Sequence, residues 1–227
     1  MVTNRIKLIA SFVNKDVVAE IGADHGYITK YLFDTKKIKY AVLTDISSKS
    51  LQKAKDNFNI LSYCNKVCFC VGDGLTALNA LTDIDISDIS QIIIAGMGAK
   101  EIISILQQNK IYKNFVLQPQ KNAIDLRIFL TKNGYRIKKD VMVKDGKIFY
   151  NVLHVVSNTS KPQKLTKRQL MFGLTNLKRP NKYFYEYLNF KKDQYMQILT
   201  NANSKEIKIK YNLIKKELDR LANFSID

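Results

Sequence analysis

The feature that most constrains the fold is the regular alternation of short β-branched runs with helix-like segments through the first 156 residues. This alternation is typical of a parallel sheet whose faces are covered by helices. Five strands are predicted, at Val17–Ile21, Tyr40–Asp45, Val67–Val71, Gln91–Ala95 and Phe115–Gln118. Helices are predicted over Ile6–Val13, from an N-cap at Ser47, over Lys100–Gln107, and from Asn122 to Asn133 and Gly134.

The last two β-rich runs differ from the first five because they follow one another directly. Tyr135–Val143 and Lys147–Val156 are separated by Lys144-Asp145-Gly146. An Asp-Gly turn between two such runs predicts an antiparallel hairpin, and α/β sheets often carry an antiparallel strand at one edge. We therefore predict an α/β fold with a Rossmann-like mixed sheet, mostly parallel, with an antiparallel edge strand.

The composition changes after residues 157–162, a polar segment that we interpret as a linker. From there to residue 227 the chain has no strand-like run and contains one glycine. Two apolar stripes, Phe184 to Ile198 and Ile207 to Leu221, have the spacing of packed helices and flank a turn at 201–204. We therefore predict two domains, 1–160 and 161–227, the second ending in a helical hairpin of coiled-coil type.

The charge balance is strongly basic, with 37 Lys and Arg against 20 Asp and Glu and a formal net charge of +17. Such a charge favours a polyanionic partner such as nucleic acid. Coding bias is the alternative, because 31 of the 37 cations are lysine, as an AT-rich gene would produce. The distribution favours function, since residues 161–227 hold 15 basic and 6 acidic residues, against 22 and 14 in the first 160.

Membrane, disulfide and metal chemistry are not expected. No apolar run reaches the roughly 18–20 residues that span a bilayer, and no secretory signal is visible, so we expect a cytoplasmic protein with no membrane partner. Cys64, Cys68 and Cys70 are too few for a disulfide framework, and only His25 and His154 accompany them. We expect no metal and a monomeric protein.

Six of the nine glycines form three pairs, each just after a predicted strand. Glycine at such a place lets the backbone turn sharply and approach a ligand closely. Ligands of open α/β sheets bind beyond the carboxyl ends of the strands. Tight βα turns need glycine even without a ligand, but three pairs at one edge predict a binding site. The pairs are Gly22 and Gly26, Gly72 and Gly74, and Gly96 and Gly98.

The acids beside these glycines indicate which ligand binds. A dinucleotide loop needs glycine where this chain has Asp24 and Tyr27, and a carboxylate there would repel a pyrophosphate. Asp45 suits the two hydroxyls of a ribose, and Asp73 an adenine amine. Glu20 and Asp24 suit an amine or a sulfonium. Capping of the following helix is the alternative for Asp24 and Asp73, but the four acids together predict S-adenosylmethionine.

On these residues the chain resembles the class I S-adenosylmethionine-dependent methyltransferases and, within them, the bacterial TrmK family, which methylates N1 of an adenine in the tRNA D-arm. The combination of Ala-Gly-Met-Gly with Leu-Gln-Pro is the most specific part of the likeness. The chain departs from the family pattern at Gly26, where alanine is frequent, and at Gln120, where asparagine is usual. The segments that carry the resemblance are 20–27, 44–45, 72–75, 94–98 and 117–119.

The resemblance implies a tRNA (adenine-N1)-methyltransferase that acts at position 22, with tRNA as its partner. It places the target base against Met97, Gly98, Gln118 and Pro119. Asp24 is our hypothesis for the residue that stabilises charge developing on the base, with His25 as the weaker candidate. The implied cofactor-binding residues are Glu20, Gly22, Ala23, Asp24, Gly26, Tyr27, Asp45, Ile46, Gly72, Asp73, Gly74, Ala95 and Gly96.

Two other functions remain open from the sequence. A small-molecule methyltransferase would have the same cofactor loops, but it would not need the basic helical domain. A non-catalytic RNA-binding module could keep the fold, although a lapsed site need not retain acids at three cofactor loops. We interpret residues 161–227 as an RNA-binding appendage, because folded RNA is bound largely through its phosphates and 2′-hydroxyls.

Overall fold

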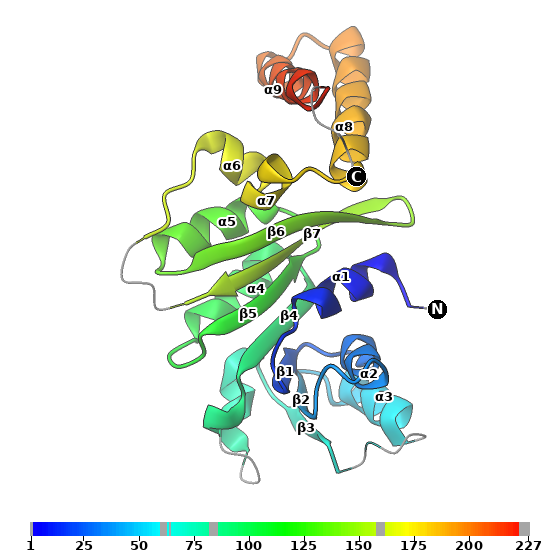
Figure 1. Cartoon of the computed structure of the whole chain (residues 1–227), viewed down its shortest axis with the longest axis vertical. Helices are drawn as coiled ribbons and strands as arrows, with labels where there is room; N and C mark the ends of the chain where they lie inside the picture. Colours follow the sequence, from blue (N-terminus) through cyan, green and yellow to red (C-terminus); the bar gives the residue numbers. More distant parts are fainter. Residues whose placement is uncertain (1, 60–62, 64, 82–85, 158–161, 223–227) are drawn as a thin grey trace.

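A single seven-stranded sheet has the order β3-β2-β1-β4-β5-β7-β6 in the computed structural model, which describes residues 2–59, 63, 65–81, 86–157 and 162–222 (Figure 1). Strands β1 to β5 are parallel, and β7 runs antiparallel between β5 and β6. The predicted mixed sheet is confirmed, with the hairpin at the edge and β7 second from it. The strands are β1 (Val17–Ile21), β2 (Tyr40–Asp45), β3 (Val67–Val71), β4 (Gln91–Met97), β5 (Asn114–Pro119), β6 (Arg136–Asp145) and β7 (Ile148–Val156).

Helices cover both faces of the sheet because the strands are apolar on both faces. Val18 and Ile93 pack under α1, α2 and α3, whereas the adjacent Ala19 and Ile92 pack under α4 and α5. Successive strand residues point to opposite faces, so one continuous apolar run serves two cores. The helices are α1 (Asn4–Phe12), α2 (Tyr27–Asp34), α3 (Ser48–Asn59), α4 (Ala99–Gln107), α5 (Ala123–Lys132), α6 (Lys167–Phe172), α7 (Leu174–Lys178), α8 (Lys182–Asn201) and α9 (Lys205–Leu221), with the 3-10 turns η1 (Gly74–Ala80) and η2 (Ile86–Asp88).

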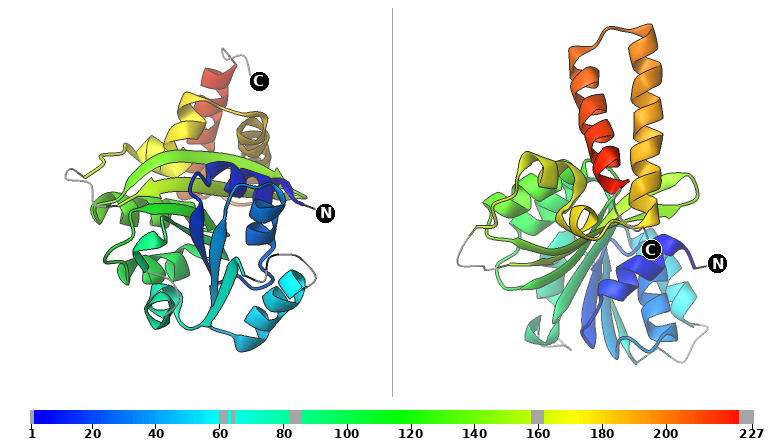
Figure 2. Two further views of the ribbon diagram at one scale, coloured as in Figure 1. Left: turned by 60° about the horizontal axis from the view of Figure 1, so that its bottom comes forward. Right: turned by 45° about the horizontal axis from the view of Figure 1, so that its top comes forward.

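The expected helical hairpin is present and projects from the sheet (Figure 2). Its lower part is anchored by a third apolar cluster, in which Phe184, Leu188 and Ile214 pack against Met142 of β6. The proposed boundary between residues 160 and 161 lies outside the described residues. Residues 163–181 lie against β6, so the part that projects consists of α8 and α9.

The exposed side of the edge strand β6 is covered by side chains from the segment 163–181. Gln163 both accepts from the backbone N–H of Ile137 (2.8 Å) and donates to its carbonyl (3.2 Å). Further along β6, the N–H of Met142 donates to Asn176 (2.9 Å), and its carbonyl accepts from Asn181 (2.9 Å). Edge strands with free backbone groups pair with other chains, so this cover protects the sheet from aggregation.

A buried ion pair joins the sheet to this covering segment. Asp140 of β6 receives two hydrogen bonds from Arg127 of α5, at 2.6 and 3.0 Å, and both side chains are excluded from solvent. The same guanidinium donates to the carbonyls of Leu170 and Met171 at the end of α6, and to Asn151 of β7. One side chain therefore ties α5, β6, β7 and α6 together.

Removal of one charge from this pair should destabilise the protein strongly. Asp140→Asn leaves Arg127 buried without a counter-ion, and breaking such a pair typically costs about 3–5 kcal/mol. Equilibrium urea unfolding should show a lower midpoint for this variant. Lys39→Gln, which removes the exposed pair with Asp16, is the control and should leave the midpoint unchanged. Equal midpoints for both variants would contradict a structural role for the buried pair.

Candidate functional site

Two adjoining cavities open at the carboxyl ends of β1 and β4, where the strand order reverses and α/β proteins bind ligands. The first, which we call the β1–β4 cavity, has a volume of about 350 Å³. The second, the β2–β3 cavity, has a volume of about 360 Å³. Gly22 and Met97 line both of them. The glycine pairs that follow β1 and β3 and lie at the end of β4 therefore meet at one edge of the sheet, as their sequence predicted, together with Asp45 and Ile46 at the end of β2.

The β2–β3 cavity contains Asp45, Ile46 and Asp73, together with Gly72 and Gly74. The Asp45 carboxylate is held in one orientation because its two oxygens accept the backbone N–H groups of Asp24 (3.1 Å) and Ser47 (2.8 Å). Each carboxylate oxygen has a second lone pair, so Asp45 retains acceptors for a ribose.

Helix capping does not explain Asp73 or Asp24. Asp73 precedes η1, but its side chain makes no capping hydrogen bond, and the first N–H groups of η1 donate to Gln108 instead. The helix after Asp24 begins beyond Gly26, which is its N-cap and offers no side chain. Both carboxylates are therefore available to a ligand.

Glu20 is the buried acid of the β1–β4 cavity, with 3% of its surface exposed. Its carboxylate accepts the N–H (3.1 Å) and the hydroxyl (2.5 Å) of Thr29. Burial raises the pKa of Glu20 to about 7, against the opposing effects of the Thr29 hydrogen bonds and the charge of Arg5. A carboxyl group that titrates near neutrality therefore lies inside the cavity.

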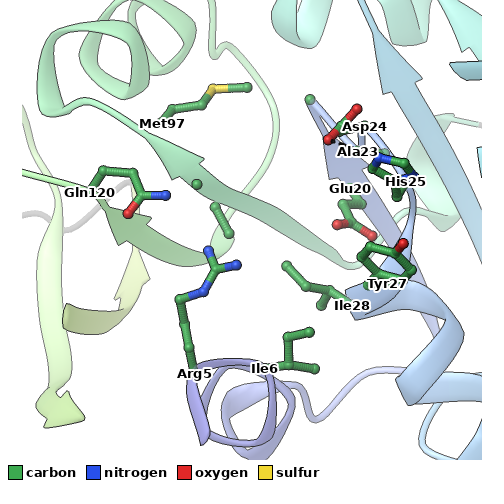
Figure 3. A pocket seen from close by; sticks show the side chains of 13 residues that line it. Arg5, Ile6, Glu20, Ala23, Asp24, His25, Tyr27, Ile28, Met97 and Gln120 are labelled. Carbon is green, nitrogen blue, oxygen red and sulfur yellow. Dashed lines mark ion pairs between the residues drawn. The ribbon is translucent and has the colours of Figure 1, made fainter. Parts of the chain in front are cut away.

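Asp24, His25 and Tyr27 also line the β1–β4 cavity (Figure 3). Asp24 adopts a left-handed backbone conformation, with φ of 47°, and its side chain is 58% exposed. Its carboxylate lies 3.8 Å from His25 Nε2 and 3.9 Å from Lys53 Nζ. The His25 ring stacks on Tyr27, with 5.1 Å between ring centroids. The structure thus brings the two predicted catalytic candidates side by side.

Met97 separates the two cavities. A Cβ added to Gly22 would lie only 1.8 Å from the Met97 methyl carbon, so the methionine side chain occupies the space that glycine leaves open. Gly22 also has a positive φ of 70°, a conformation that favours glycine. A ligand that extends from one cavity into the other therefore contacts Met97 and has to displace or pass around its side chain.

Some residues expected at the ligand lie behind the cavities instead. Gln118 is fully buried, and its Oε1 accepts from Arg5 (2.8 Å) and from the backbone N–H of Gly96 (3.2 Å), which fixes the end of β4 before Met97. Gln120, two residues after Gln118, lines the β1–β4 cavity instead of Gln118. The predicted site residues that line neither cavity are Gly26, Gly98, Gln118 and Pro119.

Arg5 is the main site residue that the sequence did not indicate. It reaches the β1–β4 cavity from α1, while its guanidinium lies 5.5 Å from the centre of the Tyr150 ring (Figure 3). Its place depends on the packing of α1 beside β7, which no local motif encodes. The sequence analysis assigned no role to Gln120, although it follows the segment 117–119 that carries part of the family resemblance.

Within the described ranges, no cluster of three or more His, Cys, Asp or Glu side chains could hold a metal ion. None of the helices described is long and apolar enough to cross a membrane.

Cys64 lies outside the described residues. His154 of β7 is half-buried away from both cavities, and burial together with Lys139 and Lys138 lowers its pKa.

Comparison with known proteins decides the family. The model of the TrmK family, described as tRNA (adenine(22)-N(1))-methyltransferase, matches residues 18–223. The chain belongs to the TrmK family. This confirms the assignment made from the cofactor loops, and with it an S-adenosylmethionine-dependent tRNA methyltransferase. The small-molecule enzyme and the non-catalytic module are thereby set aside.

Three similar proteins illustrate the relationship. MG248 of Mycoplasma genitalium, provisionally named a tRNA methyltransferase, is 38% identical over 177 residues, which are 74% of this chain and 76% of that protein. The tRNA (adenine(22)-N(1))-methyltransferase of Bacillus subtilis is 27% identical over 156 residues, 66% of this chain and 63% of that one. Streptococcus pneumoniae Sp1610, solved with S-adenosyl-L-methionine, is 26% identical with a TM-score of 0.83 over 96% of this chain and 100% of that one.

The raised pKa of Glu20 predicts a pH-dependent affinity for S-adenosylmethionine. The carboxyl group is mostly neutral below pH 7 and charged above it, and a cationic ligand favours the charged form. Calorimetric titrations should therefore show affinity rising by about fivefold from pH 6 to pH 8 when the bound cofactor lowers the pKa of Glu20 by about one unit. Glu20→Gln should lose this rise. The same pH profile in both proteins would exclude Glu20 as its source.

Proposed function

We propose that this protein transfers the methyl group of S-adenosylmethionine to N1 of adenine 22 in the tRNA D-arm, and that it works as a cytoplasmic monomer. The observation that carries the proposal is the pair of cavities that adjoin over Gly22. The β2–β3 cavity holds the adenosine half of the cofactor on Asp45 and Asp73. The β1–β4 cavity takes the methionine end beside Glu20 and receives the target adenine.

The residues of the β1–β4 cavity need only position the reactants. S-adenosylmethionine supplies a methyl group on a sulfonium, and adenine N1 carries an in-plane lone pair, so the chain does not have to remove a proton first. Arg5 and Gln118 hold the end of β4 at Gly96 in place, which fixes one wall of the cavity. Positioning of this kind accounts for much of the rate of a two-substrate transfer.

Mapping of the transferred methyl group tests the proposal directly. The protein is incubated with labelled S-adenosylmethionine and unmodified tRNA, and the product is digested to nucleosides and located by sequencing. The proposal requires 1-methyladenosine at position 22. Label at another nucleotide, or on no nucleotide, would contradict it.

Asp24→Asn should lower kcat, measured at saturating S-adenosylmethionine, by about tenfold. Methylation at N1 makes the base cationic, and the Asp24 carboxylate at the cavity stabilises that charge. The effect is smaller than the hundredfold or more seen for buried electrostatic groups, because Asp24 is more than half exposed. Asp16→Asn, before β1 at the opposite edge, is the control. Full turnover in the Asp24 variant would exclude this role.

Adenine N1 lies on the Watson–Crick edge, so the base must leave its stack to reach the cavity, and the rest of the tRNA must be held meanwhile. We propose that α8 and α9 grip the RNA backbone. Lys208, Lys215 and Lys216 are exposed on α9 and suit phosphate contacts. Deletion from Lys161 onward would also uncover β6, so substitution of these lysines is the cleaner test.

Replacement of Lys208, Lys215 and Lys216 by glutamine should weaken tRNA binding by about tenfold at 0.15 M salt and reduce the slope of log affinity against log salt by roughly 2 to 3. Filter binding over a salt series measures both. A matched control replaces Lys15, Lys36 and Lys37, which are exposed before β1 and β2 at the opposite edge. An equal loss of tRNA affinity in the two triple variants would show that the α9 lysines contribute only to the net charge of the protein and not to a local RNA-binding surface.

A further inference from the structure

The β6–β7 hairpin extends past the carboxyl edge of the parallel sheet. β5 pairs with β7 as far as Leu117 and Leu153, whereas Ile148 to Val152 pair only with β6. This overhang is five residues long, or roughly 16 Å. Because β7 is antiparallel to both neighbours, β6 ends and β7 begins at the edge where the two cavities open. The hairpin therefore forms a wall beside the active site.

A third cavity, of about 440 Å³, lies between this overhang and α8, and we call it the hairpin groove. Phe149 of β7 contacts Phe190, with 5.9 Å between ring centroids. Phe190 and Tyr185 are 51% and 40% exposed, which is unusual for large aromatic side chains. The groove thus offers ring faces to solvent.

The polar rim of the hairpin groove is mainly basic. Lys144 comes from the end of β6, Lys147 from the hairpin turn, and Asn189 from α8. Glu186 is the one acid of the lining, and it pairs with Lys144 at 2.7 Å. Lys147 is exposed. Aromatic faces beside lysines are the combination that binds unpaired nucleotides, in which the base stacks and the phosphate meets a cation.

The first turn of α1 connects the hairpin groove to the active site. Asn4 donates to the carbonyl of Lys144 (3.3 Å) and to the hydroxyl of Tyr183 on α8 (3.5 Å). The next residue, Arg5, contacts the Tyr150 ring of the overhang and lines the β1–β4 cavity. An RNA strand with its adenine in that cavity would therefore continue along the first turn of α1 toward the groove.

We propose that the hairpin groove binds a second unpaired nucleotide of the tRNA, with its base stacked on Phe190 and Tyr185 and its phosphate on Lys147. This rests on the proposed function, since the partner is the tRNA substrate. The groove then anchors the strand next to the target adenine and contributes to tRNA affinity without contact with the reacting atoms.

Two substitutions of Phe190 test the stacking. Phe190→Leu keeps an apolar side chain but removes the ring, and it should weaken tRNA binding by about tenfold, the order of effect for the loss of one stacked base. Phe190→Trp keeps a ring and should bind within twofold of the parent protein. Ile111→Ala, at a similarly exposed apolar position (55%) before β5 at the opposite edge of the sheet, is the matched control and should have no effect. Filter binding with tRNA measures all four proteins.

Further measurements separate this proposal from the proposed function. Phe190→Leu should raise KM for tRNA, with kcat at saturating tRNA and the affinity for S-adenosylmethionine unchanged. Absence of methylation by the parent protein would overturn the function, whereas the groove is judged on tRNA binding alone. Unchanged tRNA affinity in Phe190→Leu would overturn the groove. Equal weakening in the leucine and tryptophan variants, with lower melting temperatures, would also overturn it and assign Phe190 a packing role.

Discussion

The buried pair of Arg127 and Asp140 is the interaction on which the arrangement of sheet and appendage depends. A charge without water needs a partner of opposite sign and further hydrogen bonds, and Arg127 finds these only where α5, β6, β7 and the end of α6 meet. Any other arrangement of these elements leaves a charge unpaired. The pair therefore specifies where α6 and α7 lie on β6, and through them where α8 begins.

The position of α8 in turn sets the distance between the exposed lysines of α9 and the active site. Arg168 of α6 donates two hydrogen bonds of 2.6 Å to the buried Glu217 of α9, so the hairpin is fixed at two points. Because α8 and α9 are fixed in this way, their lysines lie at a constant distance from the cavities. Prepositioned contacts reduce the ordering cost of binding a large, folded RNA.

Local patterns predicted the strands and the cofactor loops because these depend on residues close in sequence. The β-branched runs placed all seven strands within two residues of their observed ends, and Asp45 together with the glycines beside Asp73 located the β2–β3 cavity. The contributions of Arg5 and Gln118 could not be predicted in the same way. Arg5 reaches the site because α1 packs beside β7, where it meets Tyr150, and Gln118 is buried because β7 lies next to β5.

The charges around the active site separate its two ligands. Glu20, Asp24, Asp45 and Asp73 gather at the cavities of a chain whose net charge is +17, and a cationic cofactor fits among them. The same acids repel phosphates over a Debye length of about 8 Å at physiological salt. Only an uncharged base enters at low cost, while the phosphates stay outside, where the hairpin lysines lie. An enzyme that methylates a base edge needs this division, because the sugar–phosphate chain must remain at the rim while the ring nitrogen reaches the methyl group.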